Sequence, residues 1–183
     1  SISTGASVFL LVTNLAFASS YAKVRLSLRQ RPNIILIMVD TLRADHLGCY
    51  GYSLKTTPNI DRFASESTRF RRAVSQASFT FWSVSSFMTS QYPQAILPPV
   101  GPAFGLDDRR LTLAELLKEQ GYSTSAIISN ANLSSKSGLK QGFDFYDDKL
   151  INEDVSSPGV LSTACKRLAG IHDRPFFMYA QFM

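Results

Sequence analysis

The sequence predicts an α/β fold in which a largely parallel central sheet carries helices on both faces. Three apolar runs have the length of buried strands, and they lie at residues 33–39, 123–129 and 175–182. Three segments of helical character separate these runs, at residues 81–89, 111–120 and 160–168. A chain that alternates strands with helices is typical of a parallel sheet, because each parallel pair needs a crossover connection.

Residues 1–31 are predicted to form an apolar helix and a basic linker, ahead of a main domain at residues 32–183. The stretch at 5–22 carries no charge, and its length is close to the roughly 20 apolar residues that span a membrane. We favour a membrane helix. The alternatives are a secretory signal peptide, with a small-residue cleavage motif at 16–18, and a helix of a soluble protein.

The first strand, at residues 33–39, is apolar along nearly its whole length, which suits a central strand covered on both faces. Residues 42–57 are expected to form a loop. Thr57 is expected to cap the helix that follows, because Pro58 suits the first helical position. A short strand is expected at residues 70–74.

The second half of the chain has clearer boundaries. Residues 91–110 hold four prolines and are expected to form a loop. The amphipathic helix at 111–120 is expected to end at Gly121, which suits the left-handed conformation past a helix end. Residues 130–157 are rich in Ser, Asn, Gly and Asp, so a loop is expected there as well.

The composition is that of an ordinary globular protein, with 45% apolar and 18% charged residues. The net charge is +5, but the basic residues do not form one block and no nucleic-acid motif is present, so we expect no nucleic-acid partner. Cys49 and Cys165 have no metal-ligand spacing, and both are expected to be small buried residues.

Asp40 is the first candidate site residue. It follows the strand at 33–39, and ligands of open α/β sheets gather at the carboxyl ends of the strands. A carboxylate there needs a partner, because burying an unpaired charge is costly. A divalent cation is one such partner, since carboxylate oxygens suit hard cations. The alternative is an Asp that caps the following turn.

Thr80 is the second candidate. It precedes the helix predicted at 81–89, and the start of a helix attracts anions. A hydroxyl beside a metal ion can act as a nucleophile. The alternative is an ordinary helix-capping role.

Other polar and aromatic residues are expected to have structural roles. His46 and His172 are single histidines in polar segments, and Trp82 has the spacing of a packing residue. A solvated acidic loop is preferred to a cation site for three aspartates, Asp144, Asp147 and Asp148.

Five segments, taken in order, resemble the N-terminal region of sulfatases and their relatives in the alkaline phosphatase superfamily. The first two read PNIILIMVDTLRADHLGCYGY and TTPNIDRFASES. The next two are a short F-x-x-A-x-S-Q stretch and TFWSVSSFMTSQYP. The last is LTLAELLKEQGYSTSAIISNANLS, followed by the loop GLKQGFDFYDD.

The resemblance implies an alkaline-phosphatase-like domain that binds a divalent cation, Ca²⁺, Mg²⁺ or Mn²⁺. Asp40 falls on the family's first metal-binding aspartate, and Thr41 replaces the second. Thr80 falls on the nucleophile, which also contacts the metal. Many sulfatases have a Cys or Ser there, matured to formylglycine in a C/S-x-P-S-R pattern. Thr cannot undergo that maturation, and Trp82 and Val84 stand in place of the Pro and Arg.

The resemblance therefore implies a metal-dependent hydrolase of sulfate or phosphate esters, acting on a small-molecule, lipid or glycan ester. One alternative is a membrane-anchored phosphoethanolamine or phosphoglycerol transferase with a Thr nucleophile, and another is a non-catalytic module. The family's other metal ligands lie downstream of Met183, so the chain alone is expected to be inactive. The family location is extracytoplasmic, either membrane-anchored or secreted, although the basic cluster at 23–31 by itself favours a cytoplasmic side.

Overall fold

The computed structural model describes residues 31–96, 105–151 and 156–183. The apolar helix expected at 5–22 lies outside these residues. Among the residues described, no helix is long and apolar enough to cross a membrane.

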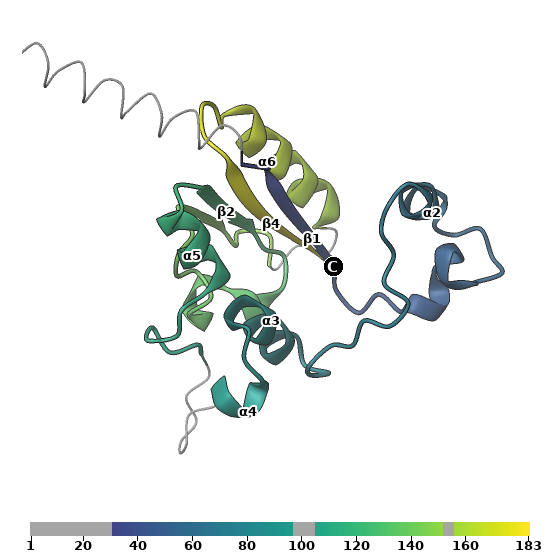
Figure 1. Cartoon of the computed structure of the whole chain (residues 1–183), viewed down its shortest axis with the longest axis horizontal. Helices are drawn as coiled ribbons and strands as arrows, with labels where there is room; N and C mark the ends of the chain where they lie inside the picture. Colours follow the sequence, from purple (N-terminus) through teal and green to yellow (C-terminus); the bar gives the residue numbers. More distant parts are fainter. Residues whose placement is uncertain (1–30, 97–104, 152–155) are drawn as a thin grey trace, which may run out of the picture.

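The core of the fold is a four-stranded sheet in the order β1-β4-β2-β3 (Figure 1). Its strands are β1 (Ile34–Val39), β2 (Ser123–Ile127), β3 (Phe145–Asp147) and β4 (Phe176–Phe182). Every neighbouring pair is parallel. The predicted α/β class with a parallel sheet is therefore confirmed. β3 was not predicted, because three residues inside a polar segment carry no strand periodicity.

Helices cover both faces of the sheet, as expected. On one face α3 (Thr80–Thr89) and α5 (Leu113–Glu119) pack over the larger core cluster, which includes Phe81, Phe177 and Tyr179. On the other face α6 (Ser157–Ala169) packs through Val160 and Ala164 on a smaller cluster. A short helix, α4 (Pro93–Ile96), lies within the segment expected to be loop.

β1 is an edge strand among the described residues, not the central strand that its apolar pattern suggested. Ile35, Ile37 and Val39 share the face on which α6 lies, but they are exposed by 51%, 63% and 42%. α6 packs on β4 and β2, so it leaves this side of β1 uncovered. The two inner strands are β4, which is buried at its five central residues, and β2, which is buried along its whole length.

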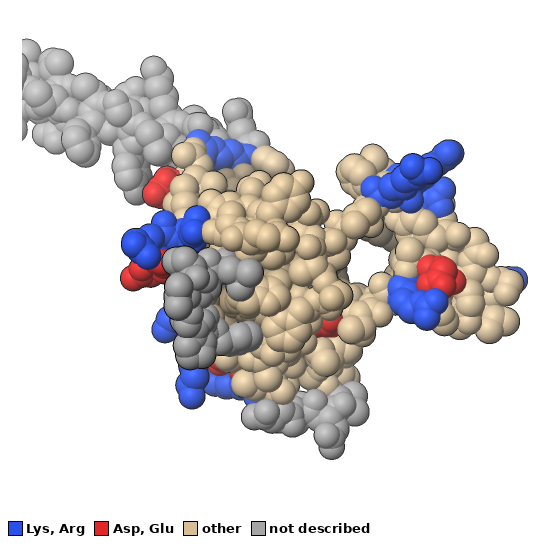
Figure 2. Space-filling view, turned by 90° about the horizontal axis from the view of Figure 1, so that it is seen from below, with Lys and Arg blue, Asp and Glu red and all other residues tan. Residues whose placement is uncertain are grey.

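Residues 41–79 leave the sheet and form a lobe (Figure 1). Its elements are η1 (Ala44–His46), η2 (Gly48–Tyr50) and α2 (Pro58–Ser65). In the space-filling view the lobe stands apart from the body, and Lys and Arg occur on both (Figure 2).

Asp61 and Thr57 hold the lobe together. The backbone N–H of Cys49 donates to Asp61 Oδ1 at 2.7 Å, and that of Gly48 donates to Thr57 Oγ1 at 3.1 Å. Thr57 stands at the N-cap of α2 with Pro58 first in the helix, as predicted, but its side chain bonds across the lobe and makes no capping bond. The short strand expected at 70–74 is also absent, because this extended segment pairs with no other strand of the described residues.

α5 begins and ends where local chemistry predicts. The hydroxyl of Thr112 accepts from the backbone of Glu115, whose carboxylate accepts from the backbone of Thr112 at 2.8 Å, which forms a capping box. Gly121 follows the helix with φ +85°, the left-handed conformation that glycine adopts without strain.

Asp144 ties α5 to the sheet. Its carboxylate lies 2.9 Å from the ammonium of Lys118 and accepts from the backbone N–H of Thr124 at 3.2 Å. Burial raises the pKa of Asp144, but the bonds from Lys118 and Thr124 outweigh burial and hold it below its usual value. Asp144, which was expected in a solvated acidic loop, thus has the structural role of holding α5 against the sheet.

Asp144→Asn is expected to lower the free energy of unfolding by about 1 kcal/mol at pH 7. A carboxylate whose pKa is depressed in the folded state stabilises above its unfolded pKa of about 3.9, and this contribution disappears as the pH falls through the folded value. The difference between variant and wild type should therefore shrink towards pH 3. Urea unfolding of the complete protein at pH 7 and at pH 3 measures this difference. Asp108→Asn, at an exposed position, is the control and should stay within about 0.5 kcal/mol. If Asp144→Asn lowered the free energy of unfolding equally at pH 3 and pH 7, the effect would not come from the ion pair.

Candidate active site

Asp40 lies at the carboxyl edge of the sheet, directly after β1. Its backbone N–H donates to the carbonyl of Phe182 at 2.9 Å, which extends the pairing of β1 with β4 by one residue. Thr41 then has φ +55°, a left-handed conformation that is uncommon for a β-branched residue. The chain thus turns sharply into the lobe, and the half-buried Asp40 carboxylate stays at the end of the sheet.

Thr80 comes to Asp40 from forty residues further along the chain. It is the first residue of α3, and its hydroxyl donates towards the Asp40 carboxylate, 3.2 Å from Oδ2 and 3.4 Å from Oδ1. The position before it, the N-cap, is Phe79. The two candidates that the sequence singled out therefore face each other across the end of the sheet.

Two further residues contact Asp40 that sequence reasoning missed, Asn130 and Gln181. Asn130 Nδ2 donates to Asp40 Oδ2 at 2.8 Å, and Gln181 Nε2 donates to the same oxygen at 3.2 Å. A signal was available, because Asn130 follows one predicted strand and Gln181 interrupts another that is otherwise apolar. Since parallel strands end at the same edge, polar residues at these ends could have been grouped with Asp40.

A cavity of about 340 Å³ opens beside Asp40 and Thr80. Its wall includes Ser75 and Ser83, whose hydroxyl oxygens lie 2.7 Å apart. Ser75 donates its proton to the carbonyl of Ala77 at 2.7 Å, so Ser83 is the donor of the pair. This chain of hydroxyls attaches the segment before α3 to the first turn of that helix.

The cavity needs an added positive charge before it can bind an anionic ligand. Asp40 is the only charged residue among the described residues that line it. An anionic ester would meet the Asp40 carboxylate without compensation, apart from the partial positive charge at the start of α3. Burial raises the pKa of the neighbouring Tyr179, and the charges of Tyr146 and Asp40 raise it further, so this phenol stays neutral.

The oxygens of Asp40 and Thr80 fit a hard divalent cation. Neighbouring ligands of one Mg²⁺ or Ca²⁺ lie roughly 2.8–3.7 Å apart, given metal–oxygen distances of about 2.0–2.6 Å. The separations of 3.2 and 3.4 Å between the Thr80 hydroxyl and the carboxylate oxygens fall in this range. The part of the chain that the structure describes holds no cluster of three or more His, Cys, Asp or Glu around a cation position.

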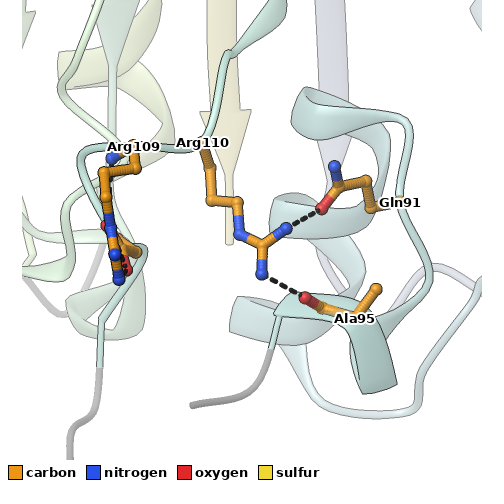
Figure 3. Close-up of polar contacts among 5 residues, drawn as sticks. Gln91, Ala95, Arg109 and Arg110 are labelled. Carbon is orange, nitrogen blue, oxygen red and sulfur yellow. Dashed lines mark hydrogen bonds and ion pairs between the residues drawn. The ribbon is translucent and has the colours of Figure 1, made fainter.

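The start of α3 is supported from its far end. The guanidinium of Arg110 donates to Gln91 Oε1 at 2.9 Å and to the carbonyl of Ala95 at 2.6 Å (Figure 3). These bonds attach the turn after α3 and the helix α4 to the segment that leads into α5. They restrain the helix whose first residue is Thr80.

The remaining candidates have structural surroundings. His46 stacks on Tyr52 in the lobe, with ring centroids 4.9 Å apart, and the ring of Trp82 makes an edge contact with Phe81. Asp148 accepts from the backbone N–H of Ser135 at 2.7 Å. The two cysteines are free, but the expectation that both are buried was wrong, because Cys49 is half-buried and Cys165 is exposed on α6.

Comparison with the sequences of known proteins finds similarity to sulfatases. The family model described as Sulfatase matches residues 32–183. Human steryl-sulfatase is 36% identical over 183 aligned residues, which cover 87% of this chain and 30% of that protein. The chain therefore spans about a third or less of the length of such curated relatives.

Solved structures share the fold. One, determined in complex with its substrate D-glucosamine-2-N,6-O-disulfate, matches with a TM-score of 0.72 at 24% identity, over 84% of this chain and 34% of that one. The soluble domain of lipooligosaccharide phosphoethanolamine transferase A from Neisseria meningitidis matches with a TM-score of 0.64 at 16% identity, over 83% and 45%.

Proposed function

The chain belongs to the sulfatase family, and on this premise we propose that the complete protein is a metal-dependent hydrolase of sulfate or phosphate esters. Thr80 is its nucleophile, and Asp40 and Thr80 are two of its metal ligands. The observation that carries the proposal is the approach of the Thr80 hydroxyl to within 3.2 Å of the Asp40 carboxylate, beside a cavity. The substrate is a small-molecule, lipid or glycan ester.

The side chains have distinct tasks in the reaction. A bound divalent cation lowers the pKa of the hydroxyl and polarises the ester oxygens. Asp40 orients the Thr80 hydroxyl, and the oxygen of Thr80 attacks sulfur or phosphorus as the bond to the ester oxygen breaks, with the hydroxyl proton ending on the departing alcohol. The start of α3 offsets negative charge on the non-bridging oxygens. Water then attacks the group held on Thr80, which releases sulfate or phosphate and restores the hydroxyl.

A transferase is the second candidate. Thr80 cannot become formylglycine, and a Thr nucleophile suits transfer of a phosphoryl group to an acceptor alcohol in place of water. The shared fold with a phosphoethanolamine transferase domain is compatible with this candidate. The third candidate, a non-catalytic module, rests on Trp82 and Val84 at the positions of the sulfatase Pro and Arg.

The proposal includes the organisation of the chain. Residues 1–31 supply a membrane helix and linker, and residues 32–183 the N-terminal portion of the sulfatase domain. The catalytic domain lies outside the cytoplasm, anchored to a membrane or, alternatively, secreted. Of the two proposed ligands only Asp40 carries a negative charge, and cation affinity depends on the number of charged ligands, so we expect this chain alone to be inactive.

Removal of metal tests the hydrolase. We expect the complete protein, treated with a chelator and assayed on sulfate and phosphate mono- and diesters, to lose turnover, and Mg²⁺, Mn²⁺ or Ca²⁺ to restore it. Release of inorganic sulfate or phosphate supports hydrolysis, whereas a new ester formed with an added alcohol supports transfer. Turnover that survives the chelator would exclude the metal mechanism. An absence of turnover on every ester would favour the non-catalytic module.

A further inference from the structure

The orientation of Asp40 is set by amide groups from two other strands. The sheet order places β4 between β1 and β2, so the ends of all three strands adjoin. Asp40 follows β1, Gln181 lies near the end of β4, and Asn130 lies three residues past β2. Gln181 is fully buried and Asn130 is 8% exposed, so neither amide has free access to bulk water.

The hydrogen bonds leave one choice for the orientation of the Gln181 amide. The backbone N–H of Ser129, which can only donate, lies 3.0 Å from Gln181 Oε1. The hydroxyl of Ser129 lies 2.9 Å from the carbonyl of Gln181 and 3.1 Å from Oε1. The amide oxygen therefore faces Ser129, and the amide nitrogen faces Asp40.

Asn130 is oriented in the same way. Its Oδ1 accepts from the backbone N–H of Asn132 at 2.9 Å, which caps η3 (Ala131–Leu133). Its Nδ2 is left to donate to Asp40 Oδ2. Both amides thus offer N–H groups, and both amide oxygens are already engaged. As oriented, each amide therefore presents a donor, and not a ligand oxygen, to Asp40.

The two donors converge on one carboxylate oxygen. Each oxygen of a carboxylate has about two lone-pair directions. On Asp40, Oδ2 receives Asn130 at 2.8 Å and Gln181 at 3.2 Å, while Oδ1 receives neither. Oδ1 is the oxygen with acceptor capacity left, and the Thr80 hydroxyl lies between the two oxygens, 3.4 Å from Oδ1 and 3.2 Å from Oδ2.

We infer that Asn130 and Gln181 are positioning residues, which hold Asp40 by Oδ2 so that it binds a cation through Oδ1 alone. The inference rests on the proposed function, because it assigns a role at the same metal site. A carboxylate restrained by two amides is already in its binding orientation, so less conformational freedom is lost when the cation binds. Loss of either amide frees the carboxylate to rotate or to bind with both oxygens.

Cation binding by the complete protein tests the inference without any need for turnover. We would measure the Mn²⁺ dissociation constant by titration calorimetry for the wild type, Gln181→Met, Asn130→Ala and Asp40→Asn. The first two variants are expected to bind Mn²⁺ about 10- to 100-fold more weakly, the usual effect of losing a group that orients a metal ligand. Gln141→Met is the matched control, because the Gln141 side chain donates to the carbonyl of Arg110 at 3.1 Å, away from Asp40, and the Mn²⁺ dissociation constant of this variant should stay within about twofold of wild type.

The outcomes separate the two proposals. If the wild type does not bind Mn²⁺, or Asp40→Asn binds it equally well, the metal site itself is wrong and the positioning role falls with it. If Asp40→Asn loses binding but Gln181→Met and Asn130→Ala bind like wild type, only the positioning role is overturned. Because Gln181 is buried, its variant could unfold. Asn130→Ala lies outside the strands, and thermal melting without metal separates loss of folding from loss of affinity.

Discussion

Replacing Thr80 with Ala is expected to reduce kcat for ester hydrolysis by at least about 1,000-fold, because the variant has no oxygen to attack sulfur or phosphorus. The folded structure should persist, since the half-buried Thr80 side chain donates only towards Asp40. Thr80→Ser keeps a hydroxyl at the same position and is expected to retain turnover within about 10- to 100-fold of wild type. Steady-state kinetics with the metal-loaded complete protein measures all three.

Thr89→Ala provides the matched control for the nucleophile. Thr89 is the last residue of the same helix, and its hydroxyl donates to the carbonyl of Ser85 at 2.7 Å, away from Asp40. Its loss should leave kcat within about twofold of wild type, as expected for a hydroxyl that bonds only within its own helix. A covalent sulfate or phosphate adduct trapped on Thr80 during turnover would support the mechanism directly. Unchanged turnover in Thr80→Ala would refute it.

Asp40→Asn is expected to weaken Mn²⁺ or Mg²⁺ binding by at least about 100-fold, because the loss of a ligand costs more than the 10- to 100-fold typical of groups that only orient ligands. The substitution keeps the size of the side chain but removes the charge that offsets the cation. Turnover at low metal concentration should fall in parallel, and high metal concentration should restore part of it. Calorimetry and metal-dependent kinetics measure the two effects.

The control for this charge is Asp45→Asn. Asp45 lies five residues away in the lobe and forms an exposed ion pair with Arg43, with 2.6 Å between Nη2 and Oδ2. Exposed pairs contribute little, so metal affinity should stay within about twofold of wild type and stability should hardly change. If Asp45→Asn lowered the metal affinity as much as Asp40→Asn, the effect would come from overall charge and not from ligation by Asp40.

Local patterns predicted the elements whose causes are local. The apolar run before Asp40 became β1, and the run that holds Gln181 became β4. The helix predicted at 111–120 became α5, whose start at Leu113 is set by a capping box of Thr112 and Glu115 that was not predicted. Thr57 occupies the predicted N-cap position before Pro58, but its hydroxyl bonds with Gly48 and Asp61 and makes no capping bond to α2.

The candidate site shows the same division between features with local causes and features that the tertiary structure decides. The sequence by itself determined that Asp40 follows an apolar strand and that Thr80 lies at the start of a helix, because apolar runs and the polar residues beside them are local properties of the chain. Only the tertiary structure decided that these two residues meet, and that Asn130 and Gln181 join them. The order β1-β4-β2 places the end of β4 between the other two strand ends, and strand order depends on which faces the crossover helices bury, not on any one segment.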